Sequence, residues 1–330
     1  MTEEWSKDKE KKILRKYRFA LTYRIIAVGL VIFTIFILYN LVLSISYDRS
    51  IRGEKLRVYG QLYVDWIHPE ITASTNPPVA RISPNLTQQT SIPVQRKVGK
   101  ERMILGEFEV VKPFITSLTR TGFSFYNPQD SSDFNFFVPK DPENNLVLSA
   151  PDSSGAWEVL DRVHEGTVAD LAFSTSTYHT PEELFHLLEG YDLKVNWMPL
   201  YMGETTNFTR GYGSQGEYML FEPWGLTHGR EIDENYWVGS IYYMGYENVE
   251  TVQSLMLENM RRLYEEDSNL MEGVFSSRDI ENRIEFVERE GFMVYGAVVT
   301  GPTKELLRLQ EVEEIRGVQI GEITHWNWVE

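Results

Sequence analysis

The sequence predicts a membrane-anchored protein of the α/β (α+β) class. It has a single N-terminal transmembrane helix, a β-rich membrane-proximal module and a C-terminal two-layer sandwich with two βαβ units. Residues 25–45, IIAVGLVIFTIFILYNLVLSI, form an uncharged apolar run. Proline and other turn-forming residues interrupt residues 69–155. After residue 156, strand-like apolar runs alternate with helix-start signals.

The apolar run is long enough to cross a bilayer. A helix of 21 residues rises ~31 Å, about the thickness of the hydrocarbon core. One alternative is a cleaved signal peptide, but its apolar core is shorter, about 7–15 residues, and Ser44-Ile45-Ser46 fits a cleavage site poorly. The other is a buried core helix, but no other stretch of the chain is as apolar. We expect a transmembrane helix over residues 25–46.

Charge predicts the orientation of this helix. Residues 1–24 hold eight basic residues, whereas a comparable length after the span holds four. The positive-inside rule therefore predicts a cytoplasmic basic tail at residues 1–24 and an extracytoplasmic location for the folded part. Of the 32 basic and 48 acidic residues, 24 and 44 lie in residues 25–330, which gives this part a net charge of −20. Such a charge disfavours binding to nucleic acid.

The tail and Asn40 each leave two interpretations open. Apolar residues recur at helical spacing among the basic residues of the tail, which predicts a helix continuous with the span: Ile13, Leu14, Tyr17 and Leu21. The tail either docks a cytoplasmic partner or serves only as a topogenic signal. Asn40 either hydrogen-bonds a neighbouring helix or meets water near the outer interface.

Residues 50–155 are predicted to form the β-rich extracytoplasmic module. Apolar positions alternate over residues 56–66, which is strand spacing, with Gly60 as a candidate bulge. Five prolines between positions 69 and 93 exclude long helices there. A second strand is expected over residues 103–111.

Residues 127–155 are rich in turn formers and are predicted to be a linker. Asp130, Asp133 and Asn135 lie in it, but the register of a calcium-binding loop is absent. We therefore expect a solvated turn.

Residues 156–330 are predicted to form the α/β domain. Strands are expected over residues 168–175 and 194–201, with a helix between them. Thr180-Pro181-Glu182-Glu183 is a capping box that starts this helix, which is expected to run to about residue 189. A second unit repeats the order, with strands over residues 292–300 and 318–326 and a helix after Pro302.

We interpret these two units as a degenerate βαβ repeat with right-handed crossovers and parallel strands, packed as a split-βαβ sandwich. A Gly- and Tyr-rich segment, residues 203–246, lies between them. Two helices near residues 249–267 and 277–290 follow it. Their acidic faces are expected to be solvated, with basic partners at helical spacing: Arg261, Arg262, Arg283 and Arg289.

No catalytic, cofactor-binding or metal-binding residue is predicted, and the chain is not expected to be an enzyme. The absence of cysteine excludes thiolate ligands and disulfides. The six histidines lack metal-ligand spacing, and residues 211–216 lack the context of a nucleophile or dinucleotide motif, which favours a flexible surface loop. Carboxylate pairs for a wall-acting hydrolase arise by chance in so acidic a chain.

Residues 236–246, YWVGSIYYMGY, hold six aromatic side chains in eleven positions. They form either a strand that fills the sheet, which we favour, or a surface that contacts a peptide or glycan.

The C-terminal part resembles a known family. Asn282-Arg283 and the following EFVEREGFMVYGAVVTGPTKELLRLQ, then VQIGEITHWNW, resemble the C-terminal domain of sigma factor regulators, and so does GTVADLAFSTSTYHTPEELF with YDLKVNW. The stretch SKDKEKKILRKYRF before the span is similar to the N-terminal region of that family. Its members of the sigma-M type are membrane-bound anti-sigma factors of Gram-positive bacteria.

This resemblance implies a role in transcription regulation and signal transduction. An extracytoplasmic domain would sense the state of the envelope, and the partner would be a sigma factor or a small membrane co-regulator. Members of this type carry several tens of cytoplasmic residues that hold the sigma factor, whereas about 24 are expected here. We expect that module to be a separate polypeptide, to be lost, or to precede the assigned start. The alternative function is an envelope protein-interaction module with no direct sigma contact.

Overall fold

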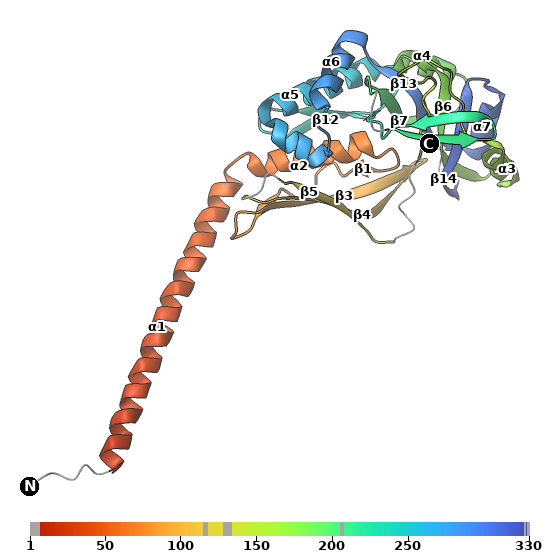
Figure 1. Cartoon of the computed structure of the whole chain (residues 1–330). Coiled ribbons are helices and arrows are strands. Elements are labelled where there is room, and N and C mark those ends of the chain that lie inside the picture. The colour runs from red at the N-terminus through yellow and green to blue at the C-terminus, as the bar shows by residue number, and fades with distance from the viewer. Residues whose placement is uncertain (1–6, 115–117, 128–133, 205–207, 327, 329–330) are drawn as a thin grey trace, which may run out of the picture.

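The computed structural model describes residues 7–114, 118–127, 134–204, 208–326 and 328. Its first element, α1 (Lys7–Asp48), is one continuous helix that projects away from the folded part (Figure 1). In the described residues one helix, Lys9–Asp48, is long and apolar enough to cross a membrane. The mean hydropathy of its apolar window is 2.7, and none of that window is buried. The predicted continuity between the tail and the apolar run is therefore confirmed.

Residues 52–67 form a helix, α2 (Arg52–Ile67), so the strand predicted over residues 56–66 is wrong. The apolar positions alternate because α2 is buried on nearly all sides, which hides the helical period. Gly60 is not a bulge but the point where a strand crosses α2 closely. A Cβ atom there would lie 2.6 Å from Cδ1 of Ile92.

The sheet beside α2 confirms the β-rich character of this region. It contains β1 (Thr72–Ala73), β2 (Arg81–Ile82), β3 (Gln88–Val98), β4 (Glu101–Lys112) and β5 (Arg120–Phe125). The order is β1-β3-β4-β5, with β2 also pairing with β3, and every pair is antiparallel. Its buried face packs on α2: Tyr63 stacks on Phe108 at 4.9 Å between ring centroids. The strand predicted over residues 103–111 corresponds to β4.

The second sheet has the order β10-β7-β13-β6-β14. Its strands are β6 (Thr167–His179), β7 (Lys194–Tyr201), β10 (Gly225–Leu226), β13 (Met293–Pro302) and β14 (Ile315–His325). The four long strands lie where the sequence predicts them. All hydrogen-bonded pairs are antiparallel. β13 lies between β6 and β7, and β6 lies between β13 and β14. The two strands of each predicted βαβ unit are therefore not hydrogen-bonded to each other.

The four helices predicted for this domain are present, although the one expected near residues 249–267 extends to residue 275. A further helix, over residues 154–162, is not among those predicted. The helices of this domain are α3 (Ser154–Arg162), α4 (Pro181–Leu187), α5 (Val249–Phe275), α6 (Ile280–Glu290) and α7 (Thr303–Arg308), and a short 3-10 turn follows (Leu309–Glu311). Both hydrogen bonds of the capping box at Thr180 are present, although α4 ends two residues before the predicted limit. α5 bends at Asp267, whose Oδ1 accepts a hydrogen bond from the N–H of Leu270.

Two segments that are expected to be a linker and a loop differ in the structure. In the expected linker, Phe136, Val138 and Leu148 are buried against the second sheet, because its short apolar pieces cover that face. Asp130 and Asp133 lie outside the described residues. The expected loop at residues 211–216 is the turn of a hairpin, β8 (Thr209–Gly213) and β9 (Gly216–Leu220).

The aromatic stretch of residues 236–246 does not fill the main sheet. Its strand, β12 (Val238–Tyr242), pairs with β11 (Gly229–Ile232) in a separate two-stranded ribbon. Tyr236 is fully buried, whereas Trp237, Tyr243 and Tyr246 are more than half exposed. The favoured interpretation, a strand that fills the sheet, is therefore wrong. The strand lies in a two-stranded ribbon, and three of its neighbouring aromatic side chains are largely exposed.

Candidate functional site

The junction between the two sheets is built around a buried acid on α2. Oδ2 of Asp65 lies 2.6 Å from Nε of Arg230 on β11 and 3.2 Å from Nε2 of His228. Oδ1 of Asp65 accepts a hydrogen bond of 2.8 Å from the N–H of Ala73 on β1. The indole N–H of Trp197 on β7 donates to the backbone oxygen of Asp65. One residue of α2 therefore contacts β1, β7 and β11.

The hydrogen-bonding partners of Asp65 stabilise its ionised form. Burial acts to raise the pKa of this carboxyl, but the Arg230 guanidinium and the His228 ring outweigh burial and lower the pKa below its usual range. The carboxylate is therefore ionised at neutral pH. A buried charge of this kind is stable only while it is paired and hydrogen-bonded, so Asp65 and Arg230 depend on each other.

Two further side chains of α2 attach it to the C-terminal domain. The Tyr59 hydroxyl donates a hydrogen bond of 2.6 Å to the backbone oxygen of Leu263 on α5. Burial raises the pKa of Tyr59 far above its usual value, so the hydroxyl stays a donor. Arg57 donates to the backbone oxygen of Tyr236, at the start of the aromatic stretch. α2 is thus fixed to both parts of the molecule.

The C-terminal end of α1 also contacts the first sheet. The Tyr39 hydroxyl donates to the backbone oxygen of Pro84, and the buried Tyr47 donates to Oε1 of Gln88. Asn40 donates to the backbone oxygen of Phe36 in its own helix. Residues 49–51 then lead directly into α2, so the long helix is attached to the folded part at its end and through α2.

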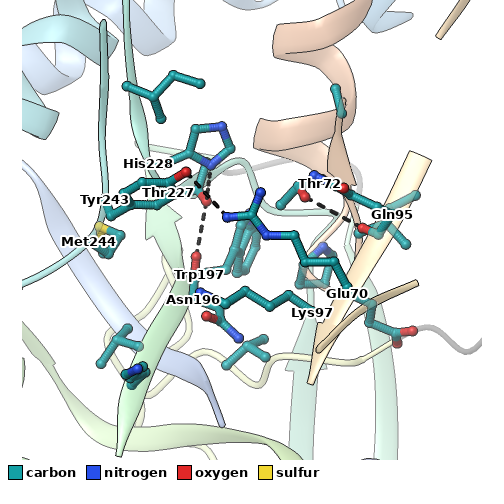
Figure 2. Close-up of a pocket in the computed structure, with 18 of the residues that line it drawn as sticks. Glu70, Thr72, Gln95, Lys97, Asn196, Trp197, Thr227, His228, Tyr243 and Met244 are labelled. Atoms are coloured by element: carbon teal, nitrogen blue, oxygen red, sulfur yellow. Dashed lines mark hydrogen bonds between the residues drawn. The ribbon is translucent and has the colours of Figure 1, made fainter. Parts of the chain in front are cut away.

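A pocket of about 330 Å³ opens beside this junction. Figure 2 shows Thr227, His228 and Tyr243 on one side, and Glu70, Thr72 and Gln95 on the other, with Lys97 and Asn196 between them. The first group lies just before β11 and after β12, and the second lies in the first sheet and in the turn that leads from α2 into it. The pocket is therefore lined by segments far apart in the chain.

The pocket wall contains an acid with an unusual environment. Asp170 on β6 is 5% exposed, and its Oδ1 has no hydrogen-bond partner in the described residues. Burial raises the pKa of Asp170 to about 7, although the Thr300 hydroxyl and the Arg96 guanidinium act to lower it. This carboxyl can therefore change its charge near neutral pH.

No site residue is predicted from the sequence, and nothing in the sequence marks this junction. Asp65, Asp170 and Arg230 come from three distant segments, so no local motif marks them. Of the six histidines, His228 is the one in the junction. The described residues contain no cluster of three His, Asp or Glu side chains that could hold a metal ion.

The arginines of α5 and α6 are expected to pair with acidic residues on solvated helix faces, and Arg283 is the exception. Arg262 pairs with Glu266 on α5, and Arg261 pairs with Glu288 across to α6. Arg283 does not lie on a solvated face: it pairs with the buried Glu204 and lies 5.4 Å from the ring centroid of Trp224. The reason is that α6 packs its Arg283 side toward the core at the end of β7.

Comparisons with known proteins give two family models and a curated relative that match this chain. Residues 11–103 match the family model for the sigma factor regulator N-terminal region, and residues 160–322 match the model for the sigma factor regulator C-terminal region. The chain is 24% identical over 242 residues to the probable anti-sigma-M factor YhdL of Bacillus subtilis (strain 168). That alignment covers 72% of this chain and 61% of the relative. No solved structure matches.

The first matched region contains nearly all of α1, then α2, β1, β2, β3 and the start of β4, and the second contains the whole second sheet except for the last three residues of β14. The protein therefore belongs to the sigma factor regulator family, a regulatory rather than a catalytic family.

Proposed function

We propose that this protein is a membrane-anchored regulator of an extracytoplasmic-function sigma factor, either an anti-sigma factor or its accessory, and not an enzyme. Residues 1–24 form its cytoplasmic basic tail and residues 25–46 its single membrane span. The outer part consists of the β-rich module of residues 50–155 and the α/β domain of residues 156–330. Family membership and the relative described as a probable anti-sigma-M factor support this role.

The observation that carries the proposal is the attachment of α1 to α2. Three residues separate the two helices, and α2 is held by Asp65, Tyr59 and Arg57 to the C-terminal domain. Any shift between the two sheets must therefore strain α2, and α2 passes that strain to the end of α1. Coupling of this kind needs contiguous rigid elements, which the junction provides.

A deletion strain tests the proposal. Deleting the gene should change the transcripts of one sigma-factor regulon, and the wild-type chain should restore them. A chain that carries Asp65→Asn should fail to restore the normal level, whereas Glu158→Gln, in an exposed ion pair of α3, should restore it. An unchanged transcriptome in the deletion strain would rule out the regulatory role.

A second candidate function is an extracytoplasmic envelope protein-interaction module with no direct sigma contact. The exposed aromatic side chains Trp237, Tyr243 and Tyr246 favour it, because exposed aromatic clusters are typical of protein-binding surfaces. Replacing residues 1–24 with an unrelated basic tail separates the two candidates. The regulator loses its effect on the sigma factor or its membrane co-regulator, whereas the interaction module keeps its function.

A further inference from the structure

The pocket between the sheets collects three cations that no carboxylate neutralises. Lys97 and Arg102 lie on the β3–β4 hairpin, and Lys194 begins β7. In the part of the chain that the structure describes, none of them forms an ion pair. Instead, Lys97 and Arg102 lie 5.9 and 6.0 Å from the ring centroid of Tyr243. Lys194 lies 4.8 Å from that of Trp328.

These charges are close enough to repel one another. Burial lowers the pKa of Lys97, and the charges of Arg102 and Lys194 lower it further, against smaller opposing effects of Tyr243 and Asp170. Two carboxylates also line the pocket, but neither forms an ion pair with these cations in the described residues: Glu70 pairs with Arg96, and Asp170 is the acid whose pKa burial raises. A bound anion would remove the repulsion.

A second, independent observation also indicates a ligand. Two buried polar atoms of the pocket wall lack a hydrogen-bond partner in the described residues, Oδ1 of Asp170 and Nη1 of Arg230. The two side chains are 5% and 2% exposed. Unsatisfied buried polar atoms are rare in folded proteins, because each has lost its water without gaining a partner. A ligand in the pocket would supply both partners.

We propose that this pocket binds a dianionic phosphate group, as carried by a phosphomonoester. Lys97, Arg102 and Lys194 are its counter-charges, and Arg230 and the neutral form of Asp170 donate hydrogen bonds to its oxygens. A phosphomonoester carries a charge of about −1.5 to −2 and three acceptor oxygens, whereas a carboxylate would neutralise one cation of the three. The role of this ligand as a signal rests on the proposed function, but its binding does not.

The charge of Asp170 is compatible with this role. Lys97, Arg96, Glu70 and Glu322 are the charged groups that face it. Because burial raises the pKa of Asp170 to about 7, a nearby dianion shifts it further toward the neutral, hydrogen-bond-donating form.

Calorimetric titration of the full chain in phosphatidylcholine nanodiscs at pH 7 tests the proposal. Glycerol 3-phosphate is the probe, and acetate at the same ionic strength is the control. We expect saturable binding of glycerol 3-phosphate and none of acetate. The double variant Lys97→Gln with Arg102→Gln should bind at least tenfold more weakly, whereas Lys100→Gln, at the turn of the same hairpin and outside the pocket, should bind like the wild type.

Each outcome has a defined meaning. The absence of saturable binding, or equal affinity in the double variant, would overturn the inference. If the double variant does not fold, Lys194→Gln applies the same test with an exposed side chain. Nanodiscs that contain phosphatidic acid distinguish the two sources of the phosphate group. If phosphatidic acid competes with glycerol 3-phosphate, the ligand is a lipid headgroup. If it does not compete, the ligand is a soluble phosphomonoester. If the chain has its normal effect on the sigma regulon but does not bind phosphate, this inference is wrong and the proposed function stands.

Discussion

Asp65 and Arg230 are 165 positions apart in the sequence, yet their side chains form a 2.6 Å ion pair with about 1% of each exposed. The pair joins α2, which follows the membrane-anchoring helix directly, to the ribbon that carries the exposed aromatic residues. It lies where the two family regions meet and beside the pocket lined by both. The proposed coupling between the folded part and α1 therefore depends on this pair.

The substitution Asp65→Asn should destabilise the protein strongly. It leaves the Arg230 guanidinium buried without a counter-charge, and breaking a buried pair in this way costs about 3–5 kcal/mol. Chemical unfolding of the full chain in detergent, followed by tryptophan fluorescence, measures the change. Glu158→Gln, in an exposed pair with Arg162, is the control and should have no measurable effect.

The same pair predicts an acid limit of stability. The pKa of Asp65 is lowered in the folded state, so its contribution is complete above the unfolded value of about 4 and is lost as pH falls below it. The free energy of unfolding of the wild type should drop below pH 4 more steeply than that of Asp65→Asn. Parallel curves for the two proteins would contradict the assignment.

Asp170 predicts the opposite pH dependence. Its pKa is raised to about 7, so the folded protein binds a proton that the unfolded chain releases above about pH 4. Stability should therefore fall by about 2–3 kcal/mol between pH 5 and pH 8 and level off above that, once the folded protein has also released this proton. Asp170→Asn should remove that decrease, whereas Asp161→Asn, an exposed residue of α3, should keep it.

Gly60→Ala tests the close crossing of α2 and the first sheet. The added methyl group would lie 2.6 Å from Cδ1 of Ile92 and 3.1 Å from Cγ2 of Val110. Overpacking of this kind in a closed core costs about 1–3 kcal/mol, despite the better helix propensity of alanine. Gly155→Ala, in α3 with nothing near its added atom, should be neutral or stabilising in the same unfolding assay. Destabilisation by both variants would point to a general effect of glycine replacement.

The features that the sequence predicts well are those set by local signals. The Thr180 capping box starts α4, the apolar run of β7 gives its bounds as residues 194–201, and the uncharged stretch of residues 25–45 lies in α1. Each of these three features depends only on residues that are close together in the chain, so it can be recognised from one sequence.

The features that the sequence does not reveal depend on distant partners. α2 looks like a strand because β1, β3, β4, α5 and β10 bury it from several directions, so its apolar residues do not follow one face. The insertion of β13 between β6 and β7 joins segments about 100 residues apart. Lys97, Arg102 and Lys194 look like ordinary surface cations, and only the fold shows that they share one pocket.

The central claim is that this chain acts on a sigma factor through the helix that crosses the membrane. The most direct measurement is a photocrosslink in intact membranes from a photoreactive residue in place of Tyr17, which is 70% exposed on α1. The account predicts a crosslinked sigma factor or small anti-sigma subunit, identified by mass spectrometry, and its loss when the tail is exchanged. Crosslinks to lipid or to envelope proteins alone would contradict the claim and place the work of this protein outside the cell.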